Sequence, residues 1–185
     1  MRSVVRARAF LSAGLCAVAM AGCSTISYNY DFDPAMDFSK YKSYAWIEVV
    51  EPSRTLQRGV SQLVEKRIIT SVDKTLASKG YTKKEEGPAD FVVHFMGTTQ
   101  EKVDFDTYYT GWGYHGWYGA TATQAYSYTE GTLIIDFFDG ASKQQVWRGM
   151  AQGTIDPNIS PEGRNARIDE AVQGIFQRFP PGPPR

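Results

Sequence analysis

An apolar repeat in the middle of the chain constrains the fold more than any other feature. Apolar residues recur at every fourth position within residues 55–79, namely Val60, Val64, Ile68, Val72 and Leu76. Because an α-helix turns once in about 3.6 residues, this spacing gathers the apolar side chains on one face. Gly80 follows, in the position where a left-handed residue commonly ends a helix. The segment therefore predicts an amphipathic helix that buries one face against another layer.

Strand-like segments flank this helix on both sides. Alternating or continuous apolar stretches occur at residues 26–30, 44–46, 90–99, 101–106, 129–139 and 144–155. The last two predict a hairpin around residues 140–143. A second helix is predicted to begin with Ser160 as N-cap and Pro161 at its first position, and to end before Pro180. We therefore expect an α+β fold, an antiparallel or mixed sheet of about five to six strands covered by two amphipathic helices.

The N-terminus has the features of a secretory signal. Basic residues precede an apolar stretch at residues 9–20 that is too short to span a bilayer. The following M-A-G-C, residues 20–23, resembles the bacterial lipobox. That resemblance implies cleavage before Cys23 and lipidation of its sulfur. An ordinary signal peptide, or a short buried helix, is the alternative interpretation.

The lipobox interpretation divides the chain into four parts. They are a lipoprotein signal peptide at residues 1–22, a lipidated anchor at 23–25, a single α+β domain at 26–180 and a frayed proline-rich tail at 181–185. Because Ser24 is not an aspartate, the sequence resembles lipoproteins sorted to the outer membrane. We therefore expect a domain that faces the periplasm from the inner leaflet of the outer membrane, with the membrane as its partner through the lipid anchor.

Composition argues against several classes of protein. Three of the 20 basic residues lie within residues 1–22, so 17 basic residues oppose 20 acidic ones in the remainder, without a basic run. Nucleic acid is therefore not an expected partner. Removal of Cys16 and acylation of Cys23 leave no thiol for a disulfide or a metal. His94 and His115 lie far apart without a metal-binding motif, so no metal or other cofactor is expected, and His94 is expected to be a hydrogen-bonded residue of the sheet.

A segment rich in aromatic residues and glycine, residues 108–128, is the main candidate for binding. Its tip contains the candidate partner-binding or ligand-binding residues Tyr109, Trp112, Tyr114, His115, Trp117 and Tyr118. Tryptophan and tyrosine combine a flat apolar face with a polar edge, which suits a glycan, a protein or a membrane interface. A disordered excursion without a ligand is the alternative. Tyr126 and Tyr128 are predicted to lie in a strand and to pack on the core.

Four carboxylates flank the aromatic segment: Asp104, Asp106, Glu130 and Asp136. Two carboxyl groups about 5 to 9 Å apart, beside stacking aromatics, are the arrangement used by glycosidases. No motif selects a pair, and the simpler interpretation is that Asp104 and Asp106 form the solvated face of an edge strand. The serine-nucleophile motif G-x-S-x-G is absent.

Several motifs together resemble the domain of unknown function 4136 family of bacterial lipoproteins. They are F-S-x-Y-x-S-Y-A-W at residues 38–46, K-G-Y at 79–81, E-G-T-L at 130–133, V-W-R-G at 146–149, I-x-x-A-V at 168–172 and F-P-P at 179–181. The likeness spans about residues 26–181. It implies an envelope lipoprotein domain with no assigned activity, and it provides no catalytic residue.

Two functional hypotheses follow. The leading one is a non-catalytic binding or assembly-accessory domain that contacts an envelope protein or glycan. The alternative is a carbohydrate-active hydrolase or glycan binder that uses the aromatic loop and the flanking carboxylates.

Overall fold

A mixed sheet forms one layer of the domain. The structure is a computed structural model that describes residues 26–47, 60–110 and 120–182. Its six strands lie in the order β1-β6-β5-β4-β2-β3. Their bounds are Ser27–Phe32 (β1), Ser43–Trp46 (β2), Thr82–Lys83 (β3), Phe91–Thr110 (β4), Ala120–Asp139 (β5) and Gln145–Ile155 (β6). The short strand β2 runs parallel to β3 and β4, whereas the other neighbours are antiparallel, which confirms the predicted α+β fold.

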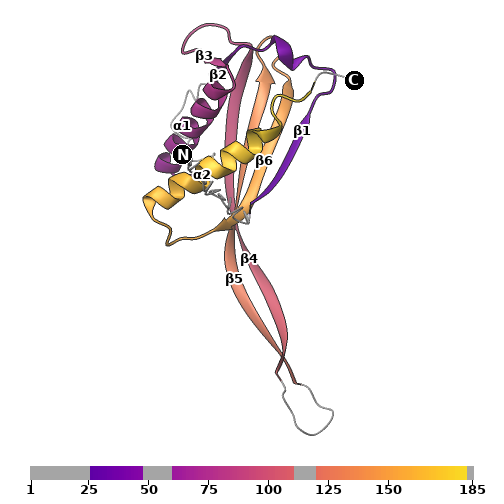
Figure 1. The fold of residues 1–185 in the computed structure, drawn as a ribbon, viewed down its shortest axis with the longest axis vertical. Coiled ribbons are helices and arrows are strands. Elements are labelled where there is room, and N and C mark those ends of the chain that lie inside the picture. Colours follow the sequence, from indigo (N-terminus) through magenta and orange to yellow (C-terminus); the bar gives the residue numbers. More distant parts are fainter. Residues whose placement is uncertain (1–25, 48–59, 111–119, 183–185) are drawn as a thin grey trace, which may run out of the picture.

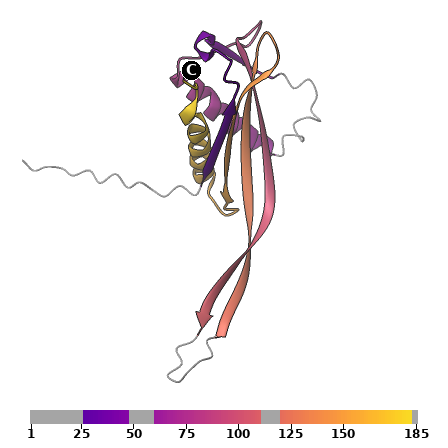
Figure 2. The same ribbon diagram turned by 90° about the vertical axis from the view of Figure 1, so that its right-hand side faces the viewer.

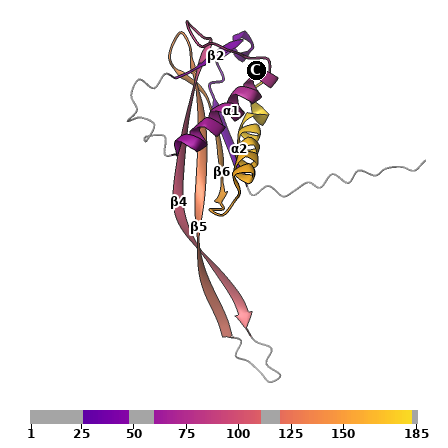
Figure 3. The same cartoon turned by 90° about the vertical axis from the view of Figure 1, so that its left-hand side faces the viewer.

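Two helices, α1 (Gln62–Ser78) and α2 (Pro161–Ile175), lie together on one face of this sheet (Figures 1 and 3). Each begins at a serine cap, since the Ser61 and Ser160 side chains accept hydrogen bonds from the backbone N–H three residues on. Gly80 has a φ of +88° directly after the end of α1, as predicted. Residues 55–59, the predicted start of the first helix, lie outside the described residues. Neither helix is long and apolar enough to cross a membrane, nor is any other within the described ranges.

An aromatic cluster fills the space between the sheet and the helices. Phe137 is its centre, with ring centroids 4.7 Å from Phe91, 4.8 Å from Trp147 and 4.8 Å from Phe179. These four side chains are at most 2% exposed. The predicted apolar face of the second helix is confirmed, because Val172 and Ile175 of α2 complete this core.

The strands β4 and β5 continue far beyond the rest of the sheet. Strand β6 ends at Ile155, opposite Thr129, so among the described residues 102–110 and 120–128 pair only with each other. We call this two-stranded element the ribbon. It extends the sheet by roughly 30 Å, at about 3.3 Å per residue. It projects as a twisted hairpin away from both helices (Figures 1 and 2).

The chain enters the domain at the end of the sheet from which the ribbon projects. Ser27 of β1 pairs with Gln152, which pairs with Thr132, which in turn pairs with Thr98. Thr98 precedes the start of the ribbon by only four residues. The first described residue, Ile26, therefore lies close to the base of the ribbon.

Candidate functional site

The ribbon exposes apolar side chains that the core does not use. Val103 and Phe105 continue the series of β4 positions that face the helices further back, and they are 59% and 64% exposed. Opposite them in β5 lie the small residues Ser127 and Ala125, which leave both side chains uncovered. An isolated two-stranded hairpin is only marginally stable in water. Exposed apolar side chains on such an element are therefore best explained by a contact surface.

The other face of the ribbon is polar. Lys102 forms an ion pair of 2.5 Å with Glu130, whose carboxylate also accepts a hydrogen bond from Gln152. The hydrogen bond from Lys102 holds the pKa of Glu130 below its ordinary value. Further along, the Tyr126 hydroxyl donates to Asp104 over 3.4 Å. The negative charges of Asp104 and then Asp106 raise the pKa of Tyr126. The ribbon is thus amphipathic, with one apolar and one charged face.

Of the predicted binding residues, only Tyr109 lies within the described part of the chain. It belongs to β4, opposite Thr121, one residue before the strand ends. The others, Trp112, Tyr114, His115, Trp117 and Tyr118, lie outside the described residues, in the segment that connects β4 to β5 along the chain.

The prediction for Tyr126 and Tyr128 is half right. Both lie in β5, but neither packs on the core, because β5 begins at Ala120 and these positions belong to the ribbon. Tyr126 is 44% exposed, and its ring lies 6.4 Å from that of Tyr128. Alternation placed both residues in a strand, but alternation alone does not show whether a strand pairs inside a sheet or beyond it.

Two of the four candidate carboxylates are already neutralised. Asp136 is 3% exposed and accepts hydrogen bonds from Arg148, Nε at 2.6 Å and Nη2 at 2.9 Å, and from Gln145 Nε2 at 2.8 Å. Burial alone would raise the pKa of Asp136, but the neighbouring His94 and Arg148 hold it below its ordinary value. Because the His94 Nδ1 is 4.0 Å from the carboxylate, we assign most of this effect to Arg148. His94 is half-buried on β4, as expected for a residue of the sheet.

The arrangement gives little support to glycoside hydrolysis. Asp136 and Glu130 lie six residues apart on β5, a separation of roughly 20 Å along a strand. Both have lowered pKa values, whereas a general acid requires a raised one. Asp104 and Asp106 are close neighbours on one face, but they project from an exposed ribbon and not from a cleft.

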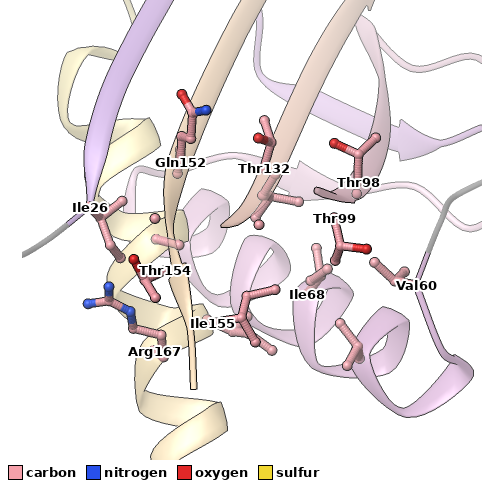
Figure 4. A pocket seen from close by; sticks show the side chains of 18 residues that line it. Ile26, Val60, Ile68, Thr98, Thr99, Thr132, Gln152, Thr154, Ile155 and Arg167 are labelled. Carbon is pink, nitrogen blue, oxygen red and sulfur yellow. The ribbon is translucent and has the colours of Figure 1, made fainter. Parts of the chain in front are cut away.

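An apolar pocket at the base of the ribbon was not predicted from the sequence. It has a volume of about 170 Å³ and lies between the sheet and both helices (Figure 4). We call it the basal pocket. It is lined by Ile26, Val60, Val64, Ile68, Gly97, Thr98, Thr99, Gly131, Thr132, Leu133, Ala151, Gln152, Gly153, Thr154, Ile155, Arg167, Ile168 and Ala171.

Glycines on three adjacent strands make room for the basal pocket. Gly97, Gly131 and Gly153 belong to β4, β5 and β6, and Gly131 pairs directly with Gly153. A Cβ atom added to Gly131 would lie 2.6 Å from the Ile155 Cδ1. Glycine inside a strand often marks such a close approach. That signal is present in the sequence, but only the strand register shows that the three positions meet.

The aromatic block at residues 38–46 has a structural role. The Tyr44 hydroxyl and the Trp46 Nε1 both donate to Asp73 Oδ1, at 2.9 and 2.8 Å, and so attach β2 to α1. Burial and the hydrogen bond to Asp73 raise the pKa of Tyr44. The Tyr41 hydroxyl donates similarly to Asp139 at 2.9 Å. These side chains are occupied by the fold and are not available to a ligand.

The V-W-R-G motif is structural as well. Val146 and Trp147 are buried in the core, and Arg148 neutralises Asp136 on the opposite face of the sheet. A Cβ atom on Gly149 would lie 2.4 Å from the Trp147 Cη2 and 2.5 Å from the Ile175 Cγ2. Each position of the motif therefore has a packing or charge requirement that accounts for its residue type.

Fold and site together define a class of protein: an α+β domain whose mixed sheet is covered by two helices on one face and extended by an amphipathic ribbon. The chain belongs to the family described as Domain of unknown function (DUF4136), whose model matches residues 28–181. A comparison with curated proteins finds no match.

Several solved structures are similar to this chain at low sequence identity. A PDZ domain protein from Parabacteroides distasonis ATCC 8503 is similar with a TM-score of 0.54 and 10% identity, over 84% of this chain and 35% of that one. The present chain therefore spans about a third of that protein. The PelC dodecamer from Paraburkholderia phytofirmans gives a TM-score of 0.40 at 9% identity, covering 82% and 94% of the two chains. A putative neuraminyllactose-binding hemagglutinin homolog from Helicobacter pylori gives 0.39 at 12% identity, covering 80% and 89%.

Proposed function

We propose that this chain is a lipid-anchored domain of the bacterial outer membrane that binds an envelope protein or glycan through the ribbon, without catalysing a reaction. The observation on which this rests is the exposed apolar pair Val103 and Phe105 on a hairpin that projects beyond the sheet. The aromatic segment 111–119 joins the two strands of that hairpin along the chain, so its side chains would extend the same contact surface.

The site of chain entry supports a partner close to the membrane. Ile26 lies beside the base of the ribbon and follows Cys23 by three residues, which span at most about 11 Å when fully extended. A lipid on Cys23 would therefore hold the base of the ribbon near the bilayer surface. The ribbon, which extends roughly 30 Å from that base, would then contact molecules at or near that surface.

In-cell photo-crosslinking tests the contact. A photoreactive amino acid is introduced at Phe105, and the matched control places it at Leu63 of α1, which is 68% exposed. We expect a discrete adduct with an envelope protein or glycan from position 105 and not from position 63. Equal adducts from both positions, or none from 105, would contradict a role for the ribbon.

Two further measurements test the anchor and the absence of catalysis. Labelled palmitate should be incorporated into the wild-type chain and not into Cys23→Ala. The lipidated protein should leave peptidoglycan fragments intact on prolonged incubation. Turnover that disappears in Asp104→Asn combined with Asp106→Asn would instead establish the hydrolase.

A further inference from the structure

We propose that the basal pocket holds the end of an acyl chain borne by Cys23 of the same molecule. This inference rests on the lipid anchor of the proposed function and adds a second role for the lipid, that of a ligand of the domain. It would couple the orientation of the ribbon to the attachment of the lipid.

The basal pocket has the chemistry of an acyl-chain site. Its walls are aliphatic on both sides, with Val64 and Ile68 from α1 and Ile168 from α2 facing Leu133 and Ile155 of the sheet. A polar ligand would lose its hydrogen bonds to water there and find few replacements. The volume of about 170 Å³ is comparable to engineered apolar cavities of about 150 Å³ that bind benzene. It therefore suits roughly six carbons of an aliphatic chain.

The position of the pocket selects the chain on Cys23 as its occupant. Ile26 itself lines the pocket, and only two residues separate it from Cys23. The acyl groups of Cys23 would thus begin within about 11 Å of the pocket wall. In Figure 4 the Ile26 side chain lies at one edge of the pocket.

The apolar surface continues out of the pocket. Gly97 and Thr99 line it, the exposed Glu101 comes next on the same series of β4 positions, and Val103 and Phe105 lie beyond it. Ile155, at the end of β6, is 40% exposed between the pocket and the ribbon. An acyl chain longer than the pocket would therefore pass Ile155 and the Glu101 side chain before it met Val103 and Phe105 on the ribbon.

The test uses the full-length lipidated protein in cells fed a diazirine-bearing fatty acid. After irradiation, the Cys23 peptide should be crosslinked to peptides that line the basal pocket, such as the one containing Ile155. Val64→Phe fills the pocket from α1 and should abolish this crosslink. Leu63→Phe, at the adjacent solvent-facing position, should leave it unchanged. If Val64→Phe fails to fold, Ala171→Leu narrows the pocket from α2 and should reduce the crosslink in a chain whose thermal unfolding is normal.

The outcomes separate the pocket from the anchor. A labelled Cys23 whose crosslinks never reach the pocket overturns this inference and leaves the anchor intact. A Cys23 without label overturns both. A pocket crosslink that persists in Cys23→Ala assigns the pocket to a membrane lipid. A crosslink that joins isotopically distinct copies of the chain assigns the pocket to the lipid of a second molecule. Either result refutes an occupant from the same chain.

Discussion

Replacement of Asp136 by asparagine isolates the contribution of this buried charge to the stability of the domain. Asp136 lies on the face of the sheet that the helices do not cover. Asparagine preserves the shape of the side chain, but it removes the negative charge and presents an amide N–H₂ group to the Arg148 guanidinium. Two charge-assisted hydrogen bonds from Arg148 and one from Gln145 are lost or weakened. Each hydrogen bond to a charged group contributes about 1.5–3 kcal/mol.

We expect the loss of stability in Asp136→Asn to lie at the lower end of the range that these three hydrogen bonds allow. The Arg148 side chain is 46% exposed, so water replaces part of what it loses. We therefore expect the free energy of unfolding to fall by about 2–3 kcal/mol for Asp136→Asn. For a domain of this size, that lowers Tm by about 4–12 °C. Thermal unfolding followed by circular dichroism at pH 7 measures the change.

The pH dependence of this difference has a definite sign. Because folding lowers the pKa of Asp136, its charge stabilises the domain above the ordinary carboxyl pKa of about 3.9. That stabilisation is lost as the pH falls through the lower pKa of the folded state. Wild type and Asp136→Asn should therefore converge in Tm below about pH 4.

Two controls complete the experiment. Asp156→Asn removes an exposed charge whose carboxylate accepts from the Asn158 N–H, and it should leave Tm nearly unchanged. The double variant Asp136→Leu with Arg148→Met removes both partners and should recover part of the loss, since neither charge remains unpaired. An unchanged Tm for Asp136→Asn at pH 7, or a loss that persists undiminished in acid, would refute the assignment of a stabilising buried charge.

The remaining predictions concern packing and exposure. Gly149→Ala should lower the free energy of unfolding by about 1–3 kcal/mol, because the new methyl group would overlap the buried Trp147 and Ile175 side chains. Chemical denaturation measures this loss, and Gly182→Ala, at a position with open space around it, is the control. Phe105→Ser should change stability by no more than about 0.5 kcal/mol, because the ring is mostly exposed, yet it should reduce the yield of partner adduct from a photoreactive amino acid placed at Val103. If Phe105→Ser lowers the free energy of unfolding by clearly more than about 0.5 kcal/mol and the adduct yield falls with it, Phe105 supports the fold instead of the contact.

Local signals account for the parts of the fold that the sequence predicted well. The serine caps, Gly80 and the four-residue apolar spacing each act within a turn or two of chain, so they show where helices begin, end and face. The hairpin around residues 140–143 was likewise predicted correctly, because its strands are adjacent in sequence.

The parts that could not be predicted depend on strand register. No local pattern shows that β6 ends at Ile155 while β4 and β5 continue, and this difference in length creates the ribbon. Asp136 meets Arg148 only because of the pairing of β5 with β6, so the same carboxylate that flanks an aromatic segment in sequence is an ion-pair partner in space. The basal pocket is lined by glycines from three strands, of which Gly131 pairs with Gly153 whereas Gly97 pairs with Leu133.

Register also explains why the family motifs provided no site. Most of their distinctive side chains are satisfied within the domain: Tyr44 and Trp46 by Asp73, Arg148 by Asp136. Residues that pack or pair internally are constrained by folding alone, so their similarity across a family says little about a ligand. Gly131 of E-G-T-L differs, because it borders the basal pocket, where a side chain would displace Ile155.

Part of the apolar surface that the core leaves uncovered lies at the end of the molecule from which the ribbon projects. Val103, Phe105 and Ile155 are exposed there, beside the basal pocket and the point at which the chain enters at Ile26. Exposed apolar surface opposes folding in water, so its persistence at this end is most readily understood if another apolar phase or partner covers it. A domain held at that end by a lipid would meet such a phase immediately. Detachment of the lipid should therefore expose this surface, and Cys23→Ala protein should self-associate more readily than a Cys23→Ala chain that also has Val103→Thr and Phe105→Ser, as measured by light scattering.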